Sequence, residues 1–200
     1  MLSDGFHDVP DGHIAAVVTS LEMTERPPPR AEVMAAPWSI RRLTDLSPEA
    51  YLDLYRAVGR DWLWFTRLVT PRDDLVAEIG DPRVEVYRLE GAGDDTAILE
   101  LDFREPDTCE LTYFGVTPGL IGGGAARWLM NRAIERAWSQ PIRRFWVHTC
   151  TLDHPSAPAF YMRSGFRPFR RQIEVAPDPR LAGLAPLDSA PHVPVIRQHA

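Results

Sequence analysis

The stretch that decides the fold is residues 116–130, VTPGLIGGGAARWLM. Three consecutive glycines, Gly122 to Gly124, stand before a run in which apolar residues recur at helical spacing to about residue 138. The start of a helix exposes unpaired N–H groups and partial positive charge, and glycines let a diphosphate approach the backbone closely. Each glycine also costs helix stability, on the order of 1 kcal/mol relative to alanine. The stretch therefore predicts a helix over 122–138 whose beginning binds a phosphate group.

The glycine run does not fit two well-known phosphate-binding motifs. It does not match the dinucleotide fingerprint, because no G-x-G-x-x-G follows the first strand, and it lacks the Gly-Lys-Ser/Thr of a P-loop. On these residues alone, an ordinary strand-to-helix turn that tolerates glycines is an alternative interpretation.

Downstream of the glycine run, the pattern returns to strand. Residues 143–150 and 170–175 read as strands, and between them PSAPAFYMRSGF (155–166) predicts a short helix closed by Gly165. A strand–helix–strand crossover implies a parallel pair inside a mixed sheet. No regular structure is assigned to the proline- and alanine-rich tail after it.

Upstream, the pattern predicts a meander of three strands, with a glycine-rich turn between the first two, at 84–90, 96–103 and 109–118. Two helices precede the meander, one from Ser47-Pro48 to about residue 58 and one over 71–79. Serine as an N-cap followed by proline at the first helical position is a typical helix start.

The chain divides into three parts by composition. Residues 1–37 form an N-terminal extension with a short strand (13–19) and a proline-rich linker, because clustered prolines fit neither a helix interior nor a central strand. Residues 38–175, beginning with a strand at 38–44, form the main domain, and residues 176–200 form a proline-rich C-terminal tail. The early strand and the tail could pack on the core or on a second subunit, so a homodimer stays open.

Charge and composition exclude several classes of protein. The chain has 22 basic and 28 acidic residues and a net charge of -6, whereas nucleic-acid binders usually carry a basic excess. No run of about 18 apolar residues suggests a membrane span, and no signal peptide is predicted, so a cytoplasmic location is expected. The two cysteines, Cys109 and Cys150, are too few for a structural zinc site, so no metal is expected and both thiols are predicted to be free.

Two motifs resemble those of a known family. Val116–Ala126 resembles V-x-P-x-x-[QR]-G-x-G-x-[GA], the signature of the GCN5-related N-acetyltransferases (GNAT). His154–Tyr161 with Gly165-Phe166 resembles the family's second motif, N-x-x-A-x-x-[LF]-Y-x-x-x-G-F, and the likeness spans about residues 38–175. It implies an α/β (α+β mixed sheet) class and a GNAT-like fold: a mixed, mostly antiparallel sheet with one parallel strand pair and about four helices. It also implies an acetyl-CoA-dependent N-acetyltransferase.

The resemblance implies a set of residues that hold the coenzyme. The backbone of Phe114 and Val116 is expected to pair with the pantetheine arm like an added strand, with Gly115 between them fitting a bulge. Three departures from the motifs remove side chains or change them: Ile121 replaces Gln or Arg, Gly123 replaces a frequent basic residue, and His154 replaces Asn. We therefore expect the cofactor to bind more weakly, with its phosphates contacted mainly by backbone N–H groups. The full cofactor set is Phe114, Val116, Ile121, Gly122, Gly123, Gly124, Ala125, Ala126, His154 and Tyr161.

Acyl transfer from a thioester needs a neutral amine, a stabilised oxyanion and a protonated leaving thiolate. The resemblance gives Tyr161 the role of the acid that protonates the thiolate; packing under the strand is the alternative. Glu110 is a candidate for helping to deprotonate the amine, on the same strand face as Val116 if no bulge intervenes; a solvated glutamate is equally expected.

Four further residues are candidates for the acceptor site. Trp64 and Arg67 lie in an aromatic-rich segment that walls the acceptor site in this family, although a packed helix junction accounts for them as well. Glu100 could bind a cationic acceptor, and His148 could point into the substrate side of its strand.

Two functions are compatible with the sequence. The first is an N-acetyltransferase of the acyltransferase class, acting on the primary amine of a small molecule or peptide by direct attack in a ternary complex. The second is a non-catalytic acyl-CoA-binding or partner-binding domain on the same fold, suggested by Ile121 and His154. The sequence does not identify the acceptor amine.

Overall fold

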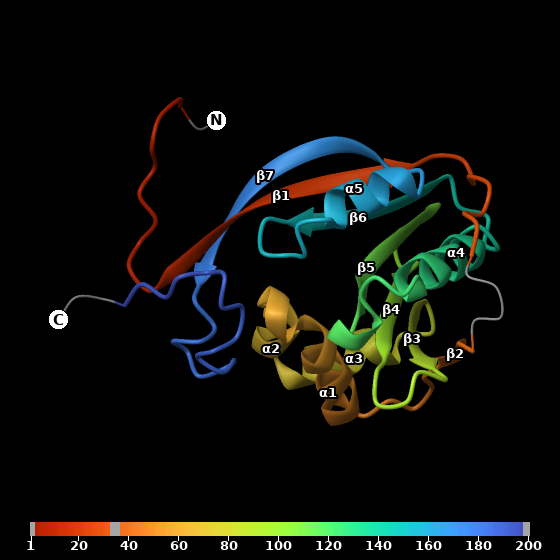
Figure 1. Cartoon of the computed structure of the whole chain (residues 1–200), viewed down its shortest axis with the longest axis horizontal. Helices are drawn as coiled ribbons and strands as arrows, with labels where there is room; N and C mark the ends of the chain where they lie inside the picture. The colour runs from red at the N-terminus through yellow and green to blue at the C-terminus, as the bar shows by residue number, and fades with distance from the viewer. Residues whose placement is uncertain (1–2, 33–36, 198–200) are drawn as a thin grey trace.

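The computed structural model describes residues 3–32 and 37–197, and Figure 1 traces the chain. Seven strands form one mixed sheet in the described residues. They are β1 (His13–Met23), β2 (Ser39–Arg42), β3 (Val84–Glu90), β4 (Ala97–Asp102), β5 (Thr108–Val116), β6 (Arg144–Cys150) and β7 (Arg167–Pro177). Their order across the sheet is β2-β3-β4-β5-β6-β1-β7, and β5 with β6 is its parallel pair. The predicted GNAT-like sheet is confirmed.

Helices cover both faces of the sheet. They are α1 (Pro48–Gly59), α2 (Thr66–Val69), α3 (Arg72–Gly80), α4 (Ala125–Ala137) and α5 (Ala157–Arg163), with short 3-10 turns η1 (Arg60–Trp62) and η2 (Pro118–Leu120). Four of the five helices correspond to predicted ones, and the additional α2 is a single turn inside the aromatic-rich segment. In the described part of the chain, none of these helices is long and apolar enough to cross a membrane.

The start of α1 follows the predicted cap. Ser47 accepts a hydrogen bond from the N–H of Ala50 at 3.2 Å, and Pro48 occupies the first helical position. The helix ends at Gly59, as expected. Its buried side chains, with those of α3, form one hydrophobic cluster against β3 and β4.

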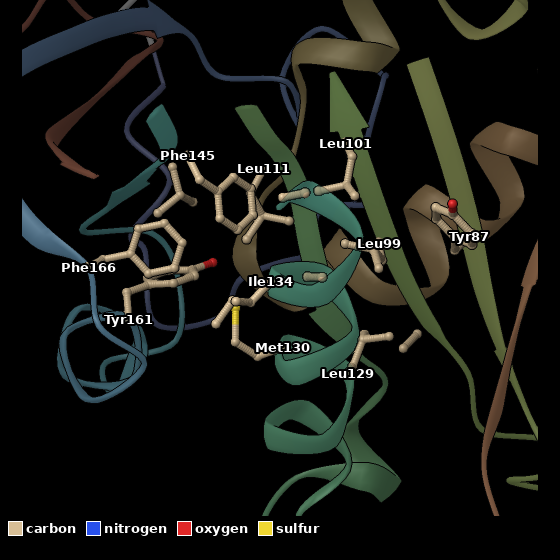
Figure 2. Close-up of a cluster of buried hydrophobic side chains, with 14 of the residues drawn as sticks. Tyr87, Leu99, Leu101, Leu111, Leu129, Met130, Ile134, Phe145, Tyr161 and Phe166 are labelled. Carbon is tan, nitrogen blue, oxygen red and sulfur yellow. The ribbon is translucent and has the colours of Figure 1, made fainter. Parts of the chain in front are cut away.

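The larger cluster lies on the opposite face, beneath α4 and α5. Figure 2 shows part of it, including Leu99 and Leu101 from β4, Leu129 and Met130 from α4, and Phe145 from β6. Because β4 contacts helices on both faces, its side chains are buried on both, with Ile98 turned toward the α1 cluster. Strand β4 is therefore central, whereas the sequence gives little sign of burial on both sides.

Strands β5 and β6 diverge after a short parallel ladder. Residues Thr108–Glu110 pair with Arg144–Trp146, and no further pairing joins the two described strands. The splay leaves residues 111–116 of β5 with a free edge toward β6, as the resemblance implied. The candidate site lies in this opening.

A bulge in β5 changes which face its side chains occupy. Glu100 pairs with Tyr113 but Leu101 pairs with Leu111, so Thr112 is the extra residue. The bulge puts Glu110 and Val116 on opposite faces and overturns the expectation of a shared face. Gly115 pairs regularly with Ile98, so the bulge predicted at Gly115 is wrong. A Cβ at Gly115 would lie 2.5 Å from Val58, which shows that glycine there permits close packing of α1.

The N-terminal strand is longer and more central than predicted. Strand β1 runs for 11 residues and pairs antiparallel with both β6 and β7, so the extension assigned to residues 1–37 contains an inner strand of the sheet. Its Leu21 and Met23 are buried in the cluster beneath α4 and α5. A local pattern shows that a segment is a strand, but which strands it joins depends on residues more than 100 positions away.

The C-terminal tail has no helix or strand over 178–197, but its residues form ion pairs, hydrogen bonds and apolar contacts. Arg180 forms a buried ion pair with Asp178 at 2.7 Å and donates to the carbonyl of Val193 at 2.8 Å. Ala190 and Val193 pack beside Leu63. The tail therefore covers the domain near the aromatic-rich segment.

Candidate active site

A cavity of about 570 Å³ opens where β5 and β6 diverge. Its lining includes the glycine turn before α4, the segment 62–66 and the residues after β6. Ten residues predicted for the site line it: Trp64, Phe114, Val116, Ile121, Gly122, Gly124, Ala126, His148, His154 and Tyr161. The structure thus brings together residues from five segments of the chain.

The glycine turn precedes the helix rather than forming its first turn. Gly122 and Gly124 have φ values of +82° and +90°, a region that favours glycine, and α4 begins at Ala125 instead of residue 122. The N–H of Trp128 bonds to the carbonyl of Gly124 at 3.0 Å, so the N–H groups of residues 125–127 are those of an open first turn. Gly123 and Ala125, which were also predicted for the cofactor site, do not line the cavity.

Tyr161 is buried in an aromatic group on the wall of the cavity. Its ring lies 5.7 Å from Phe160, 5.8 Å from Phe166 and 6.3 Å from Phe114 between centroids, and Figure 2 shows it beside Phe166. Burial raises the pKa of its phenol well above the usual value. The hydroxyl is therefore protonated at neutral pH and can donate a proton into the cavity.

The side chains of His148 and Glu110 form a pair. His148 lines the cavity, and its Nδ1 lies 3.5 Å from Oε1 of Glu110, which does not line it. Hydrogen bonding to Glu110 raises the pKa of His148, and the charges of Glu110, Asp153 and Glu174 add to this effect. Glu110 can thus act on a ligand in the cavity only through His148.

Arg67 and Glu100 are in contact with each other rather than with the cavity. Both are buried, and Nη2 of Arg67 lies 2.6 Å from Oε1 of Glu100. Tyr51 donates to the second oxygen of Glu100 at 2.6 Å, and Glu78 also pairs with Arg67. Although burial opposes its charge, the ion pair with Glu100 raises the pKa of Arg67. Neither side chain lines the cavity, so the pair joins α2 to β4 behind it.

Asp153 is a cavity residue that the sequence motifs did not single out. Its carboxylate accepts hydrogen bonds from Nε1 of Trp64 at 3.1 Å, Oγ1 of Thr149 at 2.7 Å and the N–H of Cys150 at 2.9 Å. These bonds fix the carboxylate beside His148, whose charged form it favours. Its place next to His154 in the second motif was a signal that could have drawn attention to it.

Three arginines were also not predicted from the sequence. Arg30, Arg127 and Arg163 line the cavity, and Arg30 lies close enough to the other two to feel their charges. Their side chains add positive charge to a cavity where the motif alone suggested that backbone N–H groups hold the ligand. Arg127 follows the glycine motif directly, but nothing in the sequence links Arg30 to it.

Comparison with known protein families agrees with the resemblance to the GNAT motifs. A model of the Acetyltransferase (GNAT) family matches residues 46–166, which is more than half of the 200 residues. The chain belongs to the GNAT acetyltransferase family. No curated protein matched it.

Solved structures resemble the GNAT chain in fold at low identity. A GCN5-related N-acetyltransferase from Sphaerobacter thermophilus is 18% identical with a TM-score of 0.57, covering 82% of this chain and 53% of that one. A functionally unknown conserved protein from Staphylococcus epidermidis is 14% identical with a TM-score of 0.58, covering 84% and 63%. A GCN5-related N-acetyltransferase from Kribbella flavida is 15% identical with a TM-score of 0.52, covering 86% and 63%. This chain spans about half to two-thirds of these structures, and they show the fold alone.

Proposed function

We propose that this GNAT chain is an acetyl-CoA-dependent N-acetyltransferase that acts on a primary amine by direct attack in a ternary complex. One observation carries the proposal: the glycine turn, Tyr161, His148 and Asp153 all line a single cavity. Phosphate-binding N–H groups, a protonated acid and a candidate base thus share one space at the opening between β5 and β6. The family match supports the reaction class.

Different segments of the chain bind the coenzyme and stabilise the oxyanion in the proposed reaction. The glycine turn and the open turn of α4 hold the pyrophosphate of the coenzyme, and the free edge of β5 pairs with its pantetheine arm. Acetyl-CoA, when bound, supplies the thioester that is cleaved. A backbone N–H of residues 111–116 stabilises the oxyanion that forms when the amine nitrogen attacks the carbonyl carbon.

Two proton transfers complete the reaction. His148, its proton affinity raised by Glu110, accepts a proton from the acceptor's ammonium group, so that the amine attacks in its neutral form. When the carbon–sulfur bond breaks, the thiolate takes a proton from the hydroxyl of Tyr161. The high pKa of this phenol is suited to a thiolate whose own basicity is raised by the same apolar surroundings.

The acceptor end of the cavity suits a cationic amine. It is lined by the carboxylates of Asp153 and Glu174 and by the aromatic rings of Trp62, Trp64 and Tyr113. Carboxylates attract an ammonium group, and aromatic faces bind cations. An acidic protein also favours encounter with a cationic acceptor.

Release of free thiol tests the proposal. The protein is mixed with acetyl-CoA and a panel of monoamines, diamines, amino acids and peptides with free N-termini, and thiol is followed over time. We expect thiol release with at least one amine, above a control without protein. Coenzyme binding with no turnover for any amine would instead support the non-catalytic acyl-CoA-binding domain, and absence of binding would contradict both.

Glu110→Gln tests the assignment of the base. His148 must lose its proton to act, so kcat/KM rises with pH through its pKa. Because Glu110 raises this pKa, its removal moves the acidic limb of the pH–rate profile to lower pH. Glu135→Gln, an exposed substitution on α4, serves as the control. An unchanged profile for Glu110→Gln would remove Glu110 from the mechanism.

A further inference from the structure

Three arginines from distant parts of the chain gather on the wall of the cavity. Arg30 comes from the proline-rich segment between β1 and β2, Arg127 from the first turn of α4 and Arg163 from the last residue of α5. Within residues 3–32 and 37–197, no carboxylate forms an ion pair with any of the three. By contrast, most other arginines of the described chain have an acidic partner. The cluster is therefore a local excess of positive charge in an acidic protein.

The charges of this cluster are uncompensated within the described chain. Partial burial lowers the pKa of Arg30, and repulsion from Arg127 and Arg163 lowers it further. The Nε of Arg127 is buried with no hydrogen-bond partner in the described structure. A buried donor without a partner is costly unless a ligand or water completes it. A ligand with two or more negative charges would relieve both the repulsion and the missing bond.

The backbone of Arg30 is held by one buried side chain of α4. The N–H of Arg30 donates to Oδ1 of Asn131 at 3.1 Å, and Nδ2 of Asn131 donates to the carbonyl of Arg30 at 2.8 Å. The guanidinium lies over the ring of Phe160, 5.9 Å from its centroid, and donates to Oγ of Ser164 at 3.5 Å. Asn131 therefore fixes the position of Arg30 relative to the same helix whose N-terminus faces the cavity.

We propose that Arg30 is a ligand for a phosphate group of the coenzyme and that Asn131 is the residue that positions it. The proposal rests on the proposed function, because it takes the ligand of the cavity to be coenzyme A. The N-terminal segment thereby supplies a side-chain charge to a cavity whose glycine motif has Ile121 instead of the Gln or Arg of the family. Arginine suits this role because its planar guanidinium makes paired hydrogen bonds to phosphate oxygens.

Equilibrium binding of coenzyme A to Arg30→Ala tests the proposal without requiring turnover. We expect the dissociation constant to rise by about 10- to 100-fold, as the loss of a charge-assisted hydrogen bond predicts. Arg26→Ala is the matched control, because Arg26 is an exposed arginine of the same segment that does not line the cavity. Its dissociation constant should equal that of the wild type.

A comparison of coenzyme A with dephospho-coenzyme A identifies the phosphate. Weaker binding of both ligands to Arg30→Ala would assign Arg30 to the pyrophosphate, and weaker binding of coenzyme A alone would assign it to the 3′-phosphate. Either result supports the proposal. If the wild type binds coenzyme A and Arg30→Ala binds it equally well, the proposal is wrong while the proposed function stands. If the wild type binds neither ligand, both fail.

The thermal stability of the Arg30→Ala variant distinguishes a ligand role of Arg30 from a purely structural one. Because Arg30→Ala removes repulsion from the cluster, we expect the melting temperature of the ligand-free protein to be unchanged or higher. A lower melting temperature together with normal affinity would indicate a structural role and contradict the proposal. As a single substitution, Asn131→Ala should weaken coenzyme binding. Combined with Arg30→Ala, it should weaken binding little further, since both substitutions act through one contact.

Discussion

Tyr161→Phe is expected to lower kcat by about 100-fold or more, within the range that general acid catalysis contributes. The substitution removes only the hydroxyl and keeps the ring, so the contacts with Phe114, Phe160 and Phe166 remain. Without the phenol, the departing thiolate has no acid beside it in an apolar part of the cavity. The KM for acetyl-CoA should change little, because binding does not depend on the proton.

Steady-state kinetics at several concentrations of acetyl-CoA check this prediction. Tyr87→Phe is a suitable control, because Tyr87 is also a buried tyrosine but does not line the cavity. It loses a hydrogen bond to Glu85, so it can lower stability without lowering kcat. A Tyr161→Phe enzyme that retains most of its kcat would show that the thiolate is protonated by another group or by water.

Deletion of residues 1–23 is expected to abolish cooperative folding. Strand β1 lies between β6 and β7, and β7 has no other strand partner in the described sheet. The deletion also removes Leu21 and Met23 from the core, and burial of such side chains stabilises by about 1.5–3 kcal/mol each. These losses together are comparable to the whole stability of a typical domain, about 5–15 kcal/mol.

Thermal melting followed by near-ultraviolet circular dichroism measures the effect. Deletion of residues 1–9 is the control, because it leaves β1 and the His13 to Pro10 turn intact. The control should melt cooperatively close to the wild-type temperature. A protein without residues 1–23 that also melts cooperatively near that temperature would show that β7 can pair with β6 directly. Recovery of the transition on adding a peptide of residues 10–32 would confirm that the strand itself is required.

Much of the cavity lining could be predicted because it is local. The two glycine positions with positive φ, the helix that follows them and Tyr161 within its own motif all lie in short segments whose spacing carries the information. For the same reason, the cap at Ser47 and the meander of β3, β4 and β5 were predictable. Their partners are close in sequence, so periodicity and turn residues are sufficient.

Predictions that depended on long-range packing succeeded less often. A single extra residue at Thr112 put Glu110 and Val116 on opposite faces, and no pattern in the sequence marks this bulge. Arg67 and Glu100 were candidates for the acceptor site but neutralise each other in the interior, because α2 folds onto β4. Arg30 and Asn131, which are 101 residues apart, meet only in the folded chain.

The sequence by itself determined the family resemblance, the order of the main strands and helices, and a glycine run next to the start of a helix, although it placed that start three residues too early. These features follow from hydrogen bonding and apolar periodicity within short segments of the chain. Only the tertiary structure decided that the N-terminal strand lies inside the sheet and that His148, Asp153 and Tyr161 share one cavity. It also decided that Arg30 lines that cavity close to Arg127 and Arg163. The physical reason is that burial and charge pairing act between any groups that come close in space, and the chain brings them close only when it folds.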